Sequence, residues 1–298
     1  MGPVLITGCS SGIGHATALR LARSGHLVCA TARRPEALAD LAARGCRTLA
    51  LDLADEASMT AAVGSIEAEY GPVATLVNNA GYAEIAPAEL LSPLRVRQQF
   101  QANVFGPLFL SQLVLPSMRA AGTGRIINIG SIGDRCVFPL WGGYAATKHA
   151  LTAFTDALRM ETAGTGVDVI LIELGVFATN FAAAIKGNIA ANQMTESSGC
   201  VQYAAQVDGF RALIEGVLAS ASDPGSPEGL RARLFARLSR NPDLAARTIV
   251  TAIRAPRPRT RYRVPAHARL AFATRRLLPD RTWDAAVTRV FLGKRLPR

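Results

Sequence analysis

The feature that most restricts the fold is an alternation of short apolar runs with longer amphipathic stretches. Six runs before Gly175 are almost continuously apolar, as parallel strands are when helices cover both faces of the sheet. They are 4–6, 27–30, 48–51, 76–77, 126–129 and 167–172. Helical patterns lie between them, at 13–24, 35–44, 55–69, 94–120 and 143–163. Repeated strand–helix–strand units with right-handed crossovers predict an α/β fold with a doubly wound parallel sheet.

The pattern changes after Gly175. Residues 180–240 are amphipathic and carry few strand signals, so we expect a helical lid there, with a loop of Ser, Asp, Pro and Gly at 220–227. One more strand is expected at 261–264. Helices are predicted at 266–278 and 280–292. We therefore divide the chain into a domain at 1–255, with its lid at about 180–240, and a basic C-terminal extension at 256–298.

Composition narrows the class of protein. A chain of 298 residues with 49% hydrophobic side chains is typical of one large folded α/β domain. No apolar run approaches the ~18–20 residues of a membrane span, and the N-terminus has no signal-peptide pattern. The five scattered cysteines include no C-x-x-C pair, so we expect no metal site and no disulfide framework. We expect a cytoplasmic protein.

The net charge of +11 is concentrated at the C-terminal end. Residues 231–298 hold 18 Lys or Arg and three Asp, a net of +15, whereas the rest of the chain carries a net of −4. Such a segment is either an ordinary solvated surface or a contact for anionic lipid or an acidic acyl carrier protein. No basic platform with interleaved aromatics is present, so we expect no nucleic-acid binding.

A glycine-rich turn follows the first predicted strand, at Thr7-Gly8-Cys9-Ser10-Ser11-Gly12-Ile13-Gly14. Glycines permit a tight turn and a close approach of backbone to phosphate, and the next helix would point its first amides at that phosphate. Its position between a strand and a helix favours dinucleotide binding over a mere tight turn.

The second predicted strand ends at Ala30-Thr31-Ala32-Arg33-Arg34. NAD binders place an acidic residue near this position to hold the ribose 2′-hydroxyl, but Ala32 stands there and Arg33 follows. Because arginine can bind a 2′-phosphate with charge-assisted hydrogen bonds, NADP(H) is favoured over NAD(H). The alternative is that Arg33 and Arg34 are solvated loop charges.

Tyr144 and Lys148 are four residues apart in a predicted helix, so both project from one face. A phenol has a pKa near ~10 and is a poor acid–base group at neutral pH. We predict that the neighbouring ammonium lowers the pKa of Tyr144.

These motifs occur in order with Asn78-Asn79-Ala80-Gly81, Asn103 and Ser131. Together they resemble the short-chain dehydrogenase/reductase family over residues 3–180, and more weakly its 17β-hydroxysteroid and retinol dehydrogenase-like branch. The resemblance implies a single Rossmann-like domain and an NADP(H)-dependent enzyme that interconverts ketones or aldehydes with alcohols.

The resemblance also assigns roles to a catalytic tetrad of Asn103, Ser131, Tyr144 and Lys148. Tyr144 would exchange a proton with the substrate oxygen, which Ser131 would hold. Lys148 would bind the nicotinamide ribose and tune Tyr144. Asn103 would hold a water that links Lys148 to solvent. Ser131 as a turn cap and Asn103 as a plain helix-face residue are the alternatives.

The cofactor contacts that the resemblance implies follow the strand ends. They are Gly8, Ser10, Ser11, Gly12, Ile13, Gly14, Arg33, Arg34, Asp52, Leu53, Asn79, Ala80, Gly81, Tyr144, Lys148, Gly175, Val176 and Thr179.

One of these contacts has an alternative, and two positions near the site depart from the family pattern. Asp52 would contact the adenine or, alternatively, cap the next helix. The family usually has Pro where this chain has Leu174, which we expect to loosen the turn, and more often a second serine where it has Gly130.

The expected substrate is a bulky hydrophobic carbonyl compound or alcohol, such as a steroid, retinoid, polyketide or fatty carbonyl. We predict that Phe138, Leu140, Trp141 and Phe181 line its pocket, although any of them could instead be a core residue.

The second hypothesis is a non-catalytic NADP(H)-binding sensor or scaffold. We expect a homodimer through helices 98–120 and 143–163, with a tetramer as the alternative.

Overall fold

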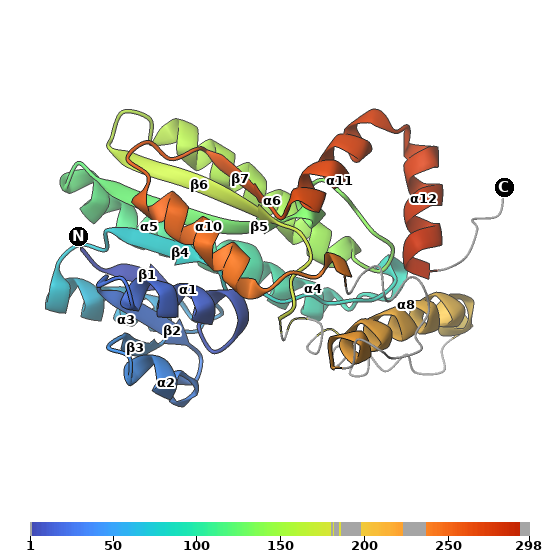
Figure 1. The fold of residues 1–298 in the computed structure, drawn as a ribbon, viewed down its shortest axis with the longest axis horizontal. Helices are drawn as coiled ribbons and strands as arrows, with labels where there is room; N and C mark the ends of the chain where they lie inside the picture. The colour runs from blue at the N-terminus through green and yellow to red at the C-terminus, as the bar shows by residue number, and fades with distance from the viewer. Residues whose placement is uncertain (1, 180, 182–184, 186–197, 223–236, 293–298) are drawn as a thin grey trace.

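The computed structural model describes residues 2–179, 181, 185, 198–222 and 237–292. Within them one sheet of seven parallel strands runs in the order β3-β2-β1-β4-β5-β6-β7 (Figure 1). The strands are β1 (Val4–Ile6), β2 (Val28–Ala32), β3 (Arg47–Ala50), β4 (Thr75–Asn78), β5 (Gly124–Ser131), β6 (Val167–Leu174) and β7 (Arg261–Val264). The order reverses between β1 and β4, which makes the fold a doubly wound, Rossmann-like single domain, as predicted.

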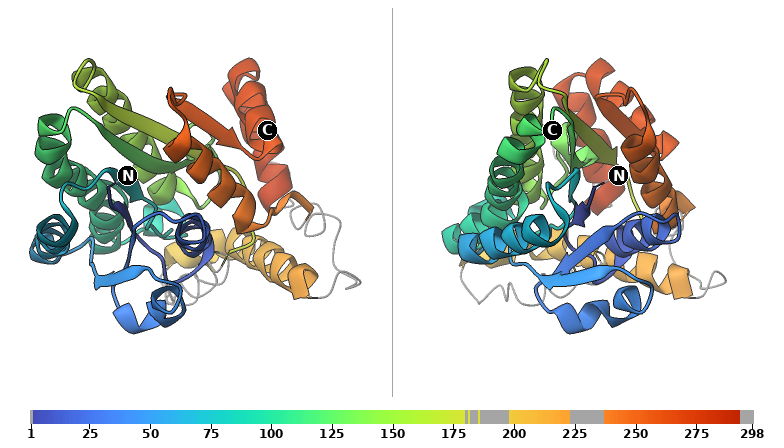
Figure 2. Two further views of the ribbon diagram at one scale, coloured as in Figure 1. Left: turned by 60° about the vertical axis from the view of Figure 1, so that its left-hand side comes forward. Right: turned by 90° about the vertical axis from the view of Figure 1, so that its left-hand side faces the viewer.

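Helices cover both faces of the sheet (Figure 2). On one face α1 (Gly12–Ala22) and α10 (Pro242–Arg254) pack together over β1, β2 and β6. On the other lie α3 (Glu56–Tyr70), α5 (Gly106–Ala120) and α6 (Gly142–Glu161). The remaining helices are α2 (Ala39–Ala42), α4 (Pro93–Phe100), α8 (Ser198–Ser222), α11 (Ala266–Leu277) and α12 (Asp280–Leu292). No helix in this part of the chain is both long and apolar enough to cross a membrane.

The predicted strands and helices are confirmed, with four differences. The strand predicted as buried at 48–51 is β3, which forms an edge of the sheet and has partly exposed side chains. The helix predicted at 94–120 contains one π-helical turn, η3 (Gln101–Phe105). The first three residues of the loop predicted at 220–227 are helical instead, because α8 continues to Ser222. The rest of that loop, and most of the lid from 180 to 197, fall outside the described residues.

The fourth difference is α10, which we did not predict. Its signals are present in the sequence: Asn241 caps the helix by accepting from the Asp243 amide at 2.8 Å, and Pro242 occupies the first turn. The buried Ala245, Ile249 and Ala252 follow the i, i+4, i+7 spacing of a core-facing stripe.

A buried carboxylate joins β7 to the rest of the sheet. The side chain of Glu173 in β6 is fully buried and accepts from Arg261 Nη1 at 3.0 Å and Arg263 Nε at 2.6 Å. Beyond this pair of strands the Gly175 amide donates to the Val264 carbonyl at 2.9 Å. The C-terminal strand is thus held by charge-assisted hydrogen bonds as well as by the ladder.

We expect Glu173→Gln to lower the free energy of unfolding by about 3 kcal/mol, because removing one partner leaves two arginines paired with a neutral amide. Urea titration measures the change. Asp168→Asn is the matched control, since Asp168 pairs with Arg125 at 2.7 Å but is 44% exposed, and its loss should stay within about 1 kcal/mol. Equal losses in the two variants would contradict the role assigned to Glu173.

Candidate functional site

The predicted site residues lie at the carboxyl edge of the parallel sheet, at or after the ends of six of its seven strands. Gly8–Gly14 follow β1, Arg33 and Arg34 follow β2, and Asp52 and Leu53 follow β3. Asn79, Ala80 and Gly81 follow β4, Ser131 ends β5, and Gly175, Val176 and Thr179 follow β6. This is the edge at which doubly wound sheets bind their ligands.

The glycine-rich turn is packed so closely that side chains are excluded. A Cβ on Gly14 would lie 2.4 Å from the Gly8 carbonyl oxygen, and one on Gly8 would lie 2.9 Å from Ala80. Gly8 and Gly12 also have positive φ angles, of 72° and 60°. Ser11, the N-cap of α1, makes no side-chain cap, which leaves the first amides of the helix to another acceptor.

Asn79 holds this turn in place. Its side-chain amide donates to the Thr7 carbonyl at 2.9 Å and the Gly8 carbonyl at 3.2 Å. In return the Thr7 hydroxyl accepts from the backbone amides of Asn79 and Ala80, both at 3.0 Å. The Asn79 side-chain nitrogen is therefore engaged within the protein, where it shapes the turn.

The ends of β2 and β3 differ in what they present. Arg33 and Arg34 are exposed, with Arg34 at the start of a short 3₁₀ turn. Asp52 accepts from the Ala54 amide at 2.9 Å, whereas Asp55 caps α3, so the alternative that Asp52 caps this helix is wrong. Leu53 is only 6% exposed and packs in the core, which leaves its backbone rather than its side chain for a ligand.

Ser131, Tyr144 and Lys148 meet at the end of β5. The Ser131 hydroxyl accepts from the Gly133 amide at 3.1 Å, and a Cβ on Gly133 would lie 3.5 Å from this hydroxyl and 3.4 Å from the Tyr144 ring, so Ser131 borders both the turn and the tyrosine. Lys148 Nζ donates to the Ile129 carbonyl at 2.8 Å and lies 5.7 Å from the centre of the Tyr144 ring.

The predicted direction of the Tyr144 pKa is wrong for this structure. Burial raises the pKa of Tyr144 to about 12, an effect that the hydrogen bond to Ser131 reduces and the charge of Asp134 reinforces. Burial likewise lowers the pKa of Lys148 to about 8. Both shifts favour neutral side chains, because a charge inside the protein loses its hydration.

Asn103 lies in the π-helical turn and is 1% exposed. Its side-chain oxygen accepts from the Tyr82 amide at 3.1 Å, and its nitrogen donates to the Tyr82 carbonyl and the Thr147 hydroxyl at 2.8 and 3.1 Å. It is thus a buried linker between α6 and the loop after β4, not a polar residue on an exposed face. A Cβ on Gly81 would come within 3.0 Å of Asn103 Oδ1 and 3.9 Å of Lys148 Nζ, so both atoms border the same exposed glycine.

Asp134 is a member of the site that we did not predict. Its carboxyl group is buried, with Oδ2 accepting from the Thr152 hydroxyl at 3.2 Å, and Oδ1 has no hydrogen-bond partner in the part of the chain that the structure describes. A Cβ on Gly130 would lie 3.3 Å from Oδ2, so the departure at Gly130 gives Asp134 its space. Gly130, where the family more often has a serine, was the sequence feature from which Asp134 could have been predicted.

The environment of Asp134 opposes its ionisation. Burial and the neighbouring carboxylate of Glu173 raise its pKa to about 7, although Thr152, Arg135 and Arg261 act in the opposite direction. When ionised, Asp134 raises the pKa of both Tyr144 and Lys148.

Aromatic rings surround Tyr144. The Trp141 ring lies 5.3 Å and the Phe181 ring 5.8 Å from it, centre to centre. Leu140 is buried in the same apolar cluster, and Phe138 stacks at 4.5 Å on Phe291 of α12. The structure thus brings the four predicted pocket residues into one cluster with Tyr144, and it adds Phe291.

The turn after β6 is held by contacts with β5, β7 and α11. Leu174 remains in the ladder, paired with Ser131 and Val264, so the loosening we expected from the missing proline is not observed. The Val176 amide donates to His267 Nε2 of α11 at 3.3 Å, and a Cβ on Gly175 would lie 2.6 Å from that nitrogen. Burial and the charge of Arg240 lower the pKa of His267, which keeps its ring a neutral acceptor. We did not predict this contact.

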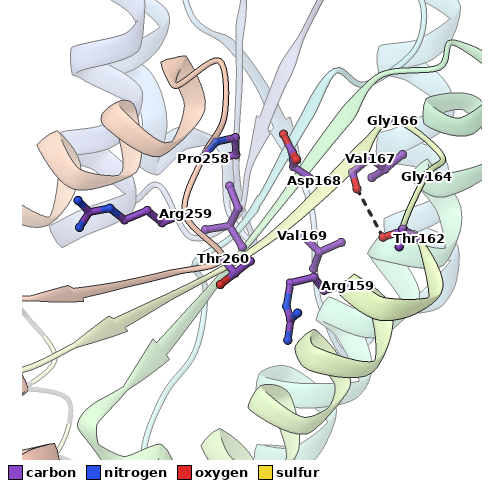
Figure 3. Close-up of a pocket in the computed structure, with 12 residues that line it drawn as sticks. Arg159, Thr162, Gly164, Gly166, Val167, Asp168, Val169, Pro258, Arg259 and Thr260 are labelled. Atoms are coloured by element: carbon purple, nitrogen blue, oxygen red, sulfur yellow. Dashed lines mark hydrogen bonds between the residues drawn. The ribbon is translucent and has the colours of Figure 1, made fainter.

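A cavity of about 420 Å³ lies at the opposite end of β6 (Figure 3). Gly166, Asp168, Arg259 and Thr260 are among its lining residues, and none of the predicted site residues is.

Comparison with known proteins identifies relatives. The family described as short chain dehydrogenase matches residues 3–189. A 3-ketodihydrosphingosine reductase of Bacteroides thetaiotaomicron is 38% identical over 179 residues, 60% of this chain and 65% of that protein, so the match spans just under two thirds of the relative.

Solved structures that resemble this chain include members of the same family. A short-chain dehydrogenase from Streptomyces avermitilis superposes with a TM-score of 0.73 at 29% identity, covering 92% of this chain and 91% of that chain. A metagenomic short-chain oxidoreductase in complex with NADP gives a TM-score of 0.57 at 28% identity, covering 66% of this chain and 93% of that chain.

We expect stability to depend on the ionisation of Asp134. Between its ordinary pKa of 3.8 and about 7 the folded protein keeps a proton on Asp134 that the unfolded chain has lost, so stability falls as pH rises through this range. Relative to wild type, Asp134→Asn should therefore gain roughly 2–3 kcal/mol between about pH 5 and about pH 8, as measured by urea unfolding. The exposed Asp284→Asn is the control, and a pH-independent difference for Asp134→Asn would refute the assignment.

Proposed function

The chain belongs to the short chain dehydrogenase family, and on this basis we propose that it is an NADP(H)-dependent oxidoreductase that interconverts a bulky hydrophobic ketone or aldehyde with its alcohol. The observation that carries the proposal is the cluster of Ser131, Tyr144 and Lys148 at the carboxyl edge of the sheet, next to a glycine turn and enclosed by aromatic rings. As a family member it acts on CH–OH or C=O groups with a nicotinamide dinucleotide.

The residues present suit that cofactor. Gly8, Gly12 and Gly14 form a turn that side chains would fill, and the first amides of α1 are available to a diphosphate. In the proposal Tyr144 and Lys148 face the nicotinamide ribose, and Gly175, Val176 and Thr179 hold the carboxamide. When bound, the cofactor supplies the hydride chemistry.

Tyr144 supplies the proton in the reducing direction. With a pKa of about 12 the phenol is fully protonated at neutral pH, so it is ready to donate to a carbonyl oxygen. Ser131 is close enough to the phenol to lower its pKa, so an oxygen that reaches Tyr144 also reaches a second donor where negative charge develops.

Lys148 restores the proton in this scheme. Its pKa of about 8 lets the ammonium exchange a proton near neutral pH, and the exposed Gly81 lies beside Lys148 Nζ and Asn103 Oδ1. We assign to this position the water through which Lys148 communicates with solvent, with Asn103 at its border.

The aromatic cluster favours a hydrophobic substrate. Phe138, Leu140, Trp141 and Phe181 pack around Tyr144 without a charged side chain among them. The Trp141 indole nitrogen is buried and has no hydrogen-bond partner within the described residues, so it is a donor available to a substrate oxygen. One relative is named a 3-ketodihydrosphingosine reductase, which is consistent with an apolar ketone.

The preference for NADP(H) rests on the end of β2. The position that would carry an acidic residue is the buried Ala32, and the exposed Arg33 follows it where a 2′-phosphate would lie. A related oxidoreductase was solved in complex with NADP.

The main rival is a non-catalytic NADP(H)-binding sensor or scaffold, and the complete tetrad of Asn103, Ser131, Tyr144 and Lys148 disfavours it.

We also propose a homodimer through α5 and α6, where Phe154 is 41% exposed. A cytoplasmic location fits the buried, unpaired Cys9, Cys29, Cys46 and Cys136.

Replacing Tyr144 by phenylalanine removes the proton donor but keeps the ring. We expect kcat for reduction of a hydrophobic ketone to fall by on the order of 10²–10⁴-fold, while NADPH binding, followed by fluorescence, changes little. Tyr70→Phe at the exposed end of α3 is the control and should retain full activity. Undiminished turnover by Tyr144→Phe would reject the catalytic assignment.

Arg33→Ala tests the choice of cofactor. Because a charge-assisted hydrogen bond to the 2′-phosphate is lost, kcat/KM for NADPH should fall on the order of 10–100-fold, with kcat/KM for NADH nearly unchanged. Arg34→Ala is the matched control for a nearby exposed charge. A parallel loss with both cofactors in Arg33→Ala would refute the discrimination by this residue.

A further inference from the structure

The helix α11 has a second apolar stripe on the side opposite its buried face. Ala268 and Phe272 pack inward and are nearly fully buried. Leu270 and Leu277 are 67% and 80% exposed and lie seven residues apart, so they project from the same outer side. The exposed Ala266 and Ala273 complete this stripe at helical spacing.

The charges beside the stripe are all positive. Arg269 and Arg276 are exposed and, like the two leucines, seven residues apart, so they form a parallel row along one flank. The sequence of α11 contains no aspartate or glutamate. We refer to Ala266, Arg269, Leu270, Ala273, Arg276 and Leu277 as the outer face of α11.

The position of α11 relates this face to the candidate site. Together α11 and α12 form a helical hairpin at one end of the molecule (Figure 1). The inner side of α12 contributes Phe291, which stacks on Phe138, and Trp283, whose ring centre lies 6.4 Å from that of Phe138. The hairpin therefore has aromatic side chains of the site cluster on its inner side and the basic, leucine-bearing face on its outer side.

We propose that the outer face of α11 docks on an anionic lipid surface. Helices that lie in a membrane interface combine an exposed apolar stripe with flanking arginines, which keep their guanidinium groups at the phosphates while the apolar side chains enter the boundary of the acyl region. Leu270 and Leu277 supply the apolar contact, and Arg269 and Arg276 supply the attraction to anionic headgroups.

The charge pattern favours this partner over a second copy of the chain. Two outer faces brought together would juxtapose arginines with no acidic residue on α11 to compensate them. An acidic protein would satisfy the arginines, but it offers no reason for Leu277 to be the most exposed large hydrophobic side chain in the described part of the chain.

If the proposed function is right, docking would also deliver the substrate. A hydrophobic carbonyl compound dissolved in the bilayer would meet the protein at the helical hairpin, whose inner side closes the aromatic cluster through Phe291 and Phe138. This consequence depends on the proposed function, whereas the docking itself does not.

The test is flotation of the full-length protein with vesicles of phosphatidylcholine, with and without phosphatidylglycerol. Wild type should float with the anionic vesicles at low salt, and binding should weaken as salt is added. Leu270→Ser/Leu277→Ser should bind on the order of tenfold or more weakly, since two leucines lose their apolar contact. Arg269→Ser/Arg276→Ser should lose roughly fivefold per arginine.

Leu94→Ser is the matched control for Leu277→Ser, because Leu94 is also an exposed leucine, at 61%, on α4. Thermal unfolding checks that each variant is folded, and the activity assay is run separately so that failed docking is distinguished from failed catalysis. Equal flotation of wild type and the double leucine variant would overturn the proposal, as would wild type that never floats. A change in oligomeric mass without a change in flotation would assign the face to self-association and would also overturn it.

Discussion

The site depends on the absence of side chains where β1 turns into α1. Gly14 fits directly over the Gly8 carbonyl, and the amide of Asn79 ties the same turn to the end of β4. Because this packing sets the distance between the two strand ends, it also sets where α1 begins and where its amides point. The parts of the site that follow β4, β5 and β6 are placed against this turn through the register of the sheet.

Electrostatics explain why Tyr144 and Lys148, the proposed acid–base pair, depend on their neighbours. In a buried setting Tyr144 and Lys148 each prefer to be neutral, so their chemistry is set by groups that alter the field around them. Ser131 stabilises the phenolate through a hydrogen bond, while Asp134 brings a carboxyl group whose own charge depends on pH. The pair is therefore tuned from the end of β5 as well as from its own helix.

Much of the fold could be predicted from the sequence, because apolar runs and glycine positions reflect what neighbouring residues require of the backbone. The strands, the flanking helices and the order of the motifs were predicted in this way, as was the last strand at 261–264. The direction of the Tyr144 pKa was predicted wrongly, since spacing along a helix reveals a nearby cation but not the loss of hydration on burial. The contacts of Asp134 and His267 were also missed, because each depends on segments that are distant in sequence: Glu173 and Thr152 in one case, the turn after β6 in the other. The same limitation hid the stacking of Phe138 on Phe291.

The ion pairs between β6 and β7 have a consequence for the order in which the chain folds during synthesis. A ribosome releases Glu173 well before Arg261 and Arg263, with the lid and α10 in between. Until those arginines arrive, Arg135 at 3.7 Å is the one cation among the three ion-pair partners described for Glu173 that has been made, so most of the compensation for burying this carboxylate is still missing. The edge of the nascent sheet at β6 consequently stays open to water late into translation. The hairpin of α11 and α12 can pack against the aromatic cluster only after β7 has covered this edge.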